Sequence, residues 1–158
     1  MKFDPTDQSW LNPPHTPYAP ALAGEGVDLD HLVMINTRDQ GDFLWTLENC
    51  LRSPVTGLVL AWPGKLASRD VRRLQLASEA GGNVCVLFRS RRFAEQNYPA
   101  ALRLELAPGE HQELKVNIIK RRGSWPGQRC STALGHRANI AVQDSSRVVQ
   151  GPWPEARG

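Results

Sequence analysis

The sequence predicts an α/β fold in which a parallel βαβαβ sheet is followed by an antiparallel hairpin. Three short apolar runs, residues 31–36 (HLVMIN), 57–62 (GLVLAW) and 83–88 (NVCVLF), start 26 residues apart. Amphipathic helical patterns fill the two gaps between them. Continuous apolar runs are typical of strands covered on both faces, and their alternation with helices indicates parallel pairing with right-handed crossovers. After residue 100 polar and apolar side chains alternate strictly, which predicts the hairpin.

The first twenty residues are predicted to contain no long helix. Prolines at positions 13, 14, 17 and 20 each remove a backbone donor and favour extended geometry in the preceding residue. A short helix is expected over residues 20–23. Residues 1–9 are assigned to an irregular N-terminus.

The first long helix is expected within residues 38–53. Its apolar side chains recur on one helical face, at Phe43, Leu44, Leu47, Cys50 and Leu51. Thr37 and Gln40 have the spacing of a capping box, and Pro54 ends the helix.

The second long helix is expected within residues 67–82. One face carries Val71, Leu74 and Ala77. Ser68 is the expected N-cap, and the pair Gly81-Gly82 supplies the C-terminal stop.

The expected hairpin has two alternating strands joined by a turn at Pro108-Gly109. One face carries the apolar side chains Leu102, Leu104, Leu106, Leu114, Val116 and Ile118. We place this hairpin at the edge of the parallel sheet. The α/β domain then spans residues 10–123, and residues 124–158, which show no period, are predicted to be a disordered basic tail.

The composition is that of one ordinary globular domain, with 158 residues, 41% hydrophobic and 22% charged. No apolar run reaches the ~18 residues of a membrane span. The N-terminus lacks the apolar core of a secretory signal, so we expect a cytoplasmic protein. Cys50, Cys85 and Cys130 are widely spaced, which favours free thiols in a reducing compartment over a disulfide framework.

The motifs of nucleotide, metal and hydrolase chemistry are missing from the sequence. Pro63-Gly64-Lys65 follows a strand, but the glycine that opens a phosphate loop is absent and Leu66 replaces its hydroxyl residue. Cys130 and His136 supply only two of the ligands that a zinc site needs. No G-x-S-x-G elbow is present. We therefore expect no enzymatic activity, no cofactor and no metal.

Basic residues form three clusters, which are the candidate contacts for a partner protein or DNA. They are Arg69, Arg72 and Arg73 on the second helix, Arg89, Arg91 and Arg92 after the third strand, and Lys120, Arg121 and Arg122 after the last strand. Loops that follow parallel strands gather at the carboxyl edge of the sheet, where ligands usually bind. Trp125, beside the last cluster, either stacks on a base or packs against the protein. The alternative is that these charges only keep a sheet edge in solution.

Several segments together resemble the SulA/ImuA family of damage-inducible bacterial proteins. They are PPHTPYAPALAGEGVDLDHLVMIN, LVLAW, RRLQLASEAGG, LFR and IIKRRG, and the resemblance runs from about Trp10 to Trp125. It implies a fold similar to RecA that has lost the ATPase residues, so the expected sheet is a partial RecA-like one. Ala61 and Trp62 then stand where a RecA-like ATPase carries its magnesium-binding acid.

Within this family, PPHTPYAPAL and IIKRRG point to ImuA, the accessory protein of translesion synthesis, more than to SulA, the inhibitor of the division protein FtsZ. The resemblance implies a non-catalytic adaptor of the SOS response that supports error-prone translesion DNA synthesis. Its implied partners are an ImuB-like polymerase homologue, a DnaE-type polymerase and RecA, with DNA as a further contact. Two alternatives stay open, SulA-like inhibition of division through FtsZ and a non-functional fragment. The resemblance also implies that an N-terminal part with the first central strand is lacking.

Overall fold

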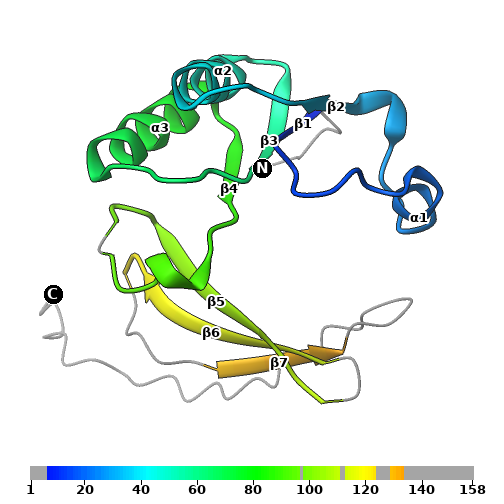
Figure 1. Ribbon diagram of the computed structural model, residues 1–158, viewed down its shortest axis with the longest axis vertical. Coiled ribbons are helices and arrows are strands. Elements are labelled where there is room, and N and C mark those ends of the chain that lie inside the picture. Colours follow the sequence, from blue (N-terminus) through cyan, green and yellow to red (C-terminus); the bar gives the residue numbers. More distant parts are fainter. Residues whose placement is uncertain (1–6, 97, 111–112, 124–128, 134–158) are drawn as a thin grey trace, which may run out of the picture.

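The computed structural model describes residues 7–96, 98–110, 113–123 and 129–133, which form a parallel and an antiparallel sheet (Figure 1). This arrangement confirms the predicted fold class. The two sheets are separate, and no strand of one is hydrogen-bonded to a strand of the other in the described part of the chain.

The parallel sheet has four strands in the spatial order β2 (Leu32–Ile35), β1 (Asp7–Leu11), β3 (Thr56–Ala61) and β4 (Val84–Leu87). The three strands expected from the apolar runs are β2, β3 and β4. Between β2 and β3 lies β1, which pairs in parallel with both. The expectation of an irregular segment at residues 7–9 is therefore wrong. Residues 1–6 lie outside the described part. The sequence DQSWL hides this strand because only its last two residues are apolar.

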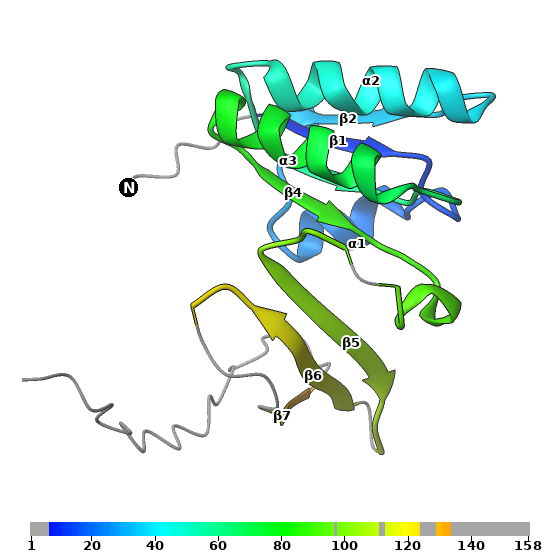
Figure 2. The ribbon, with the colours of Figure 1, turned by 90° about the vertical axis from the view of Figure 1, so that its left-hand side faces the viewer.

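Both long helices cover the same face of the parallel sheet (Figure 2). Helix α2 (Gln40–Arg52) is capped by Asp39, whose carboxylate accepts from the Asp42 amide at 2.9 Å, and not by Thr37. Helix α3 (Ser68–Gly81) has Ala67 as its N-cap in place of the expected Ser68. The predicted stop is present, because Gly82 takes a left-handed conformation with φ of 69°.

The connection from β1 to β2 contributes little cover to the sheet. It contains α1 (Ala19–Gly24), which corresponds to the expected short helix, and the 3₁₀ turn η1 (Leu29–His31). Neither element has a buried residue, and α1 lies beyond the β2 edge in Figure 1. The two helices α2 and α3 thus leave the opposite face of the sheet without a helical layer.

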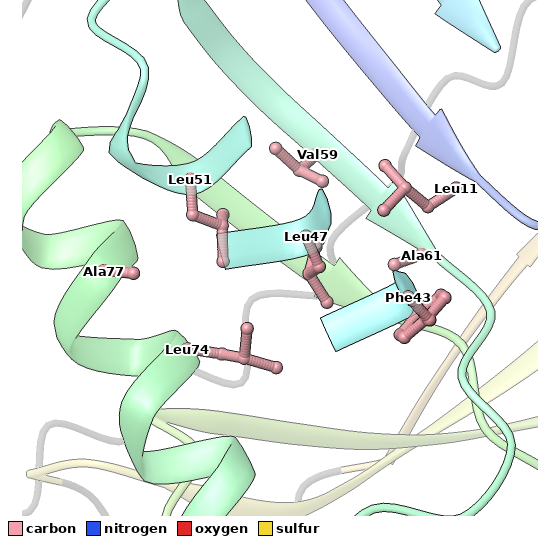
Figure 3. Close-up of a cluster of buried hydrophobic side chains, with 8 residues drawn as sticks. All are labelled: Leu11, Phe43, Leu47, Leu51, Val59, Ala61, Leu74 and Ala77. Atoms are coloured by element: carbon pink, nitrogen blue, oxygen red, sulfur yellow. The ribbon is translucent and has the colours of Figure 1, made fainter. Parts of the chain in front are cut away.

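The main core lies between the parallel sheet and these two helices (Figure 3). Its side chains are Leu11, Val59 and Ala61 from the strands and Phe43, Leu47, Leu51, Leu74 and Ala77 from the helices. Every one of them is at most 2% exposed. The periodicity of the sequence predicts all of these helical members. Of the other residues it predicts, Leu44 and Cys50 are only partly buried against this cluster, and Val71 is buried in a second cluster with Leu66 and Tyr98.

The antiparallel sheet consists of β5 (Leu102–Pro108), β6 (Glu113–Arg121) and β7 (Arg129–Ala133), with β6 in the centre. The predicted hairpin is present as β5 and β6. Its expected position at the edge of the parallel sheet is wrong, because β7 joins it to form a second sheet. This third strand lies inside the segment 124–158 that was expected to be disordered; residues 124–128 and 134–158 of that segment are outside the described part.

The helices of the described part are all too short or too polar to cross a membrane.

Candidate partner-binding surface

The face of the parallel sheet opposite α2 and α3 is apolar and partly exposed. Side chains alternate between the faces of a strand, so the residues that do not enter the helix-covered core share this second face. They are Gln8, Trp10, Leu32, Met34, Leu58, Leu60, Trp62, Val84, Val86 and Phe88. None of them is buried, and Met34 is 46% exposed. Parallel sheets are usually covered on both faces, so this face is a candidate surface for a partner.

Three aromatic rings form a continuous row at the carboxyl end of this face. The Trp62 ring stacks on Phe88 with centroids 4.8 Å apart and planes 13° from parallel, and Trp10 meets Trp62 at 6.1 Å and 54°. We call Trp10, Trp62 and Phe88 the aromatic row. Such rings bury large areas on binding at a small entropic cost, and they dominate many protein interfaces.

Backbone hydrogen bonds hold the aromatic row in place beyond the ends of the strands. The Trp62 amide donates to the Leu11 carbonyl at 3.1 Å, and the Phe88 amide donates to the Ala61 carbonyl at 2.8 Å. These bonds continue the strand pairing by one residue on each side. The row is therefore fixed by the sheet and does not depend on a loop conformation.

The sequence did not single out the aromatic row. Its apolar runs indicate strands covered on both faces, and that reading assigns Trp62 and Phe88 to an interior. The feature of the sequence that could have indicated this row is an aromatic residue within one residue of the end of three strands. The fold places these three strands side by side.

The first basic cluster lies apart from this surface, on the helix-covered side of the sheet. Each of its members has a local partner. Arg69 lies 3.9 Å from the Asp70 carboxylate, Arg72 donates to Gln75, and Arg73 pairs with Glu48 on α2 at 3.0 Å. The structure thus does not bring this cluster together with the other two.

The second basic cluster surrounds the 3₁₀ turn η2 (Arg91–Phe93), which follows β4. The Arg89 guanidinium lies between two rings, 4.5 Å from the Phe93 centroid and 4.4 Å from that of Tyr98. Arg92 lies 4.8 Å over the Phe93 ring, and Arg91 pairs with Glu105 on β5 at 2.7 Å. Cation–π stacking therefore orients the guanidinium groups of Arg89 and Arg92, and an ion pair orients that of Arg91.

The third basic cluster meets the second one at Tyr98. Lys120 on β6 donates to the Tyr98 carbonyl at 3.3 Å, while the ring of the same tyrosine contacts Arg89. Lys120 thus folds back onto the protein, whereas Arg121 and Arg122 are exposed. Trp125 lies outside the described residues.

The titratable side chains of the described part show no arrangement typical of catalysis. No group of three or more His, Cys, Asp or Glu residues in that part is placed to hold a metal ion. Burial raises the pKa of the Cys85 thiol to about 12 and also raises the pKa of Cys50. Both thiols are therefore protonated and weakly nucleophilic near neutral pH. A hydrogen bond to Asp7 raises the pKa of His31, which is a surface contact between η1 and β1.

Comparison with known proteins relates the chain to SulA. No protein-family model matches it. A cell division inhibitor SulA of Edwardsiella piscicida is 28% identical over 80 residues, which are 51% of this chain and 48% of that protein. The chain thus matches about half the length of this relative. The crystal structure of SulA from Pseudomonas aeruginosa superposes with a TM-score of 0.49 at 18% identity, over 56% of this chain and 74% of that one.

The similarity supports the SulA side of the expected relationship and corrects the functional expectation. The translesion-synthesis reading rested on the segments PPHTPYAPAL and IIKRRG, and the relative found is a SulA. The adaptor role, the ImuB-like, DnaE-type and RecA partners and the RecA-like relationship find no support in either comparison.

Proposed function

We propose that this chain is a non-catalytic protein-binding domain that inhibits bacterial cell division in the manner of SulA, by binding FtsZ in the cytoplasm during the SOS response. The observation that carries this proposal is the 80-residue similarity to a SulA named as a cell division inhibitor. The match covers 48% of that protein, so binding to FtsZ is part of the proposal and is tested directly by the experiment below.

The proposed contact surface is the open apolar face of the parallel sheet, with the aromatic row at its carboxyl end. Its partly exposed rings and aliphatic side chains offer the kind of apolar area that excludes water from the centre of an interface. Arg92 comes four residues after Phe88 and is exposed, whereas Arg89 is held between two rings and Arg91 is paired with Glu105. Arg92 is therefore the cation of this cluster that is left for a partner carboxylate beside the apolar face.

The absence of catalysis is part of the same proposal. The sequence has no phosphate loop, and the described part has no metal-binding cluster. Strand β3 ends at Ala61, which is fully buried in the core, and the next residue, Trp62, belongs to the aromatic row. The strand end that nucleotide hydrolases use for a metal-binding acid is here occupied by packing residues.

The test is sedimentation of FtsZ polymers formed with GTP, at increasing concentrations of the full 158-residue chain. Substoichiometric to equimolar chain is expected to reduce the pelleted FtsZ. Trp62→Ala and Phe88→Ala are each expected to weaken this effect by ~10-fold or more, which is the scale of an interface hot spot. Trp45→Ala is the matched control, because Trp45 is an exposed tryptophan (69%) on helix α2, on the other side of the sheet.

Circular dichroism and thermal unfolding of each variant separate lost binding from lost folding. If the folded wild-type chain leaves FtsZ assembly unchanged and does not co-sediment with it, the proposed partner is wrong. If Trp45→Ala weakens inhibition as much as Trp62→Ala does, the partner is right and the assigned surface is wrong.

A further inference from the structure

The antiparallel sheet turns its polar face toward the rest of the protein and its apolar face outward. On β5 the charged side chains Arg103 and Glu105 are partly buried, whereas the alternating leucines Leu102, Leu104 and Leu106 are 51%, 46% and 49% exposed. An antiparallel sheet usually shows the opposite arrangement, with its apolar face on the core and its polar face in water.

Contacts with the segment around η2 fix this inverted orientation. Arg91 pairs with Glu105 at 2.7 Å, Arg103 donates to the Ala94 carbonyl, and Lys120 donates to the Tyr98 carbonyl. Arg103 and Lys120 are cross-strand partners, so they and Glu105 share one face of the sheet. That face is occupied by the chain itself, and within the described part of the chain the opposite face is the exposed one.

The outward face is apolar across all three strands. Paired residues of an antiparallel sheet lie on the same face. The rows are Leu104 with Ile118, Leu106 with Val116 and Cys130, and Pro108 with Leu114 and Thr132. We call these residues together with Leu102 the leucine face. Each of them is partly or fully exposed in the described structure.

The charge on the leucine face is positive. Arg121 pairs with Leu102 and so lies at one end of this face, and the exposed Arg122 follows it. The strand carboxylates of the described part lie on the other face. Glu105 is opposite Asn117 there, and Glu113 alternates with Leu114. A partner that covers the leucine face therefore meets apolar side chains and two arginines that have no ion-pair partner among the described residues.

We propose that the leucine face binds an acidic amphipathic α-helix of a partner protein. A helix with an apolar stripe is the usual cover for one face of an antiparallel sheet. Carboxylates beside that stripe complement Arg121 and Arg122. A second copy of this chain is a poorer occupant, since it brings the same cations and no carboxylate on this face. The leucine face belongs to a different sheet from the aromatic row, so this inference does not depend on FtsZ.

The probe is a synthetic helical peptide with leucines at i, i+3, i+4 and i+7 and glutamates on both flanks of that stripe. It carries a fluorophore, and its anisotropy is measured as the full chain is added. A second peptide with lysine in place of every glutamate tests the charge. The glutamate peptide is expected to bind, and the lysine peptide is expected to bind ~10-fold more weakly or worse, a difference that shrinks at high salt.

Two variants of the chain assign the binding to the leucine face. Leu104→Ser is expected to weaken binding of the glutamate peptide by ~10-fold. Leu76→Ser is the matched control, since Leu76 is 48% exposed on helix α3, and it is expected to bind as the wild type does. Arg121→Glu keeps every leucine and leaves Arg122 next to the new carboxylate, so it is expected to abolish the preference for the glutamate peptide.

The remaining outcomes overturn the proposal. Equal binding of both peptides, or equal loss in Leu104→Ser and Leu76→Ser, would mean non-specific apolar adhesion. Sedimentation velocity without peptide tests the other occupant. A dimer that Leu104→Ser converts to a monomer, with Leu76→Ser still dimeric, would assign the leucine face to a second copy of the chain.

Discussion

The side chain of Asn12 holds Thr37 by three hydrogen bonds. Its carbonyl accepts from the Thr37 amide at 2.7 Å and from the Thr37 hydroxyl at 3.3 Å, and its amide donates to that hydroxyl at 2.9 Å. Asn12 has φ of 50°, a left-handed conformation that is uncommon outside glycine. This contact joins the end of central strand β1 to the segment that leads into α2, beside the aromatic row.

Replacing Asn12 is expected to destabilise the fold. Asn12→Ala removes the bonds to the partly buried Thr37 and leaves the strained φ in place, so it should lower the free energy of unfolding by about 1–3 kcal/mol. Asn12→Gly loses the same bonds but relieves the strain, and should cost less than alanine. Urea unfolding measures both. Asn49→Ala is the control, because Asn49 is exposed on α2. A lower free energy of unfolding for Asn12→Gly than for Asn12→Ala would contradict this account.

Leu47 is the expected weak point of the core. It is fully buried between α2 and the parallel sheet, so Leu47→Ala should cost about 2–5 kcal/mol through lost burial and a residual cavity. Leu76→Ala on the exposed face of α3 should stay within about 0.5 kcal/mol of the wild type. Denaturant midpoints of the two variants check this. Equal losses in the two variants would contradict the burial of Leu47 in the described core.

His31 is expected to make stability depend on pH. Its hydrogen bond to Asp7, with further help from Asp28 and Asp30, raises the pKa of the folded histidine above its usual 6.5. The contribution is therefore fully present below about pH 6.5 and is lost as pH rises through the raised folded value. His31→Gln should remove this part of the pH dependence of Tm between about pH 5.5 and 8.5. His15→Gln, at another exposed histidine, is the control and should behave like the wild type.

The three cysteines are expected to react with a maleimide in the order of their exposure. Cys130 is exposed and should be labelled first. Cys85 has its pKa raised to about 12 by burial, so its thiolate is scarce near pH 8 and its labelling should follow unfolding of the chain. Mass spectrometry of peptides from a labelling time course gives the order. Fast labelling of Cys85 in the folded chain would contradict its packing against the core.

The sequence determines the helices more clearly than the sheets. Leu47, Leu51 and Leu74 recur with helical spacing, and the structure buries each of them. The ends of the helices are less clear from the sequence. Asp39 and Thr37 are both N-cap residue types near the start of α2, and in the structure the Asp39 carboxylate accepts the hydrogen bond from the Asp42 amide. Strand β1 does not show as a run of apolar residues, because one of its two buried side chains is Ser9. Strands β2 and β3 flank β1 on both sides, so β1 lies inside the sheet although its own sequence has few apolar residues.

The candidate surfaces were beyond sequence reasoning for a different reason. A pattern of apolar residues predicts that a face exists, but it does not say which elements cover that face. The leucines of β5 were correctly placed on one side of a hairpin, and the contacts of η2 decide that this side faces outward. The three basic clusters were visible in the sequence, and only the fold shows that two of them meet at Tyr98.

The central position of β1 has a consequence for synthesis of the chain. Gln8 pairs with Leu32 on one side and with Leu58 on the other, so the ribosome makes β1 well before either neighbour. At roughly 5–20 residues per second, the strand waits for seconds with both edges unpaired. Among the described strands β2 pairs with β1 alone, so in this sheet it joins only through β1. The nascent chain is thus most exposed to chaperones and proteases until β3 has emerged.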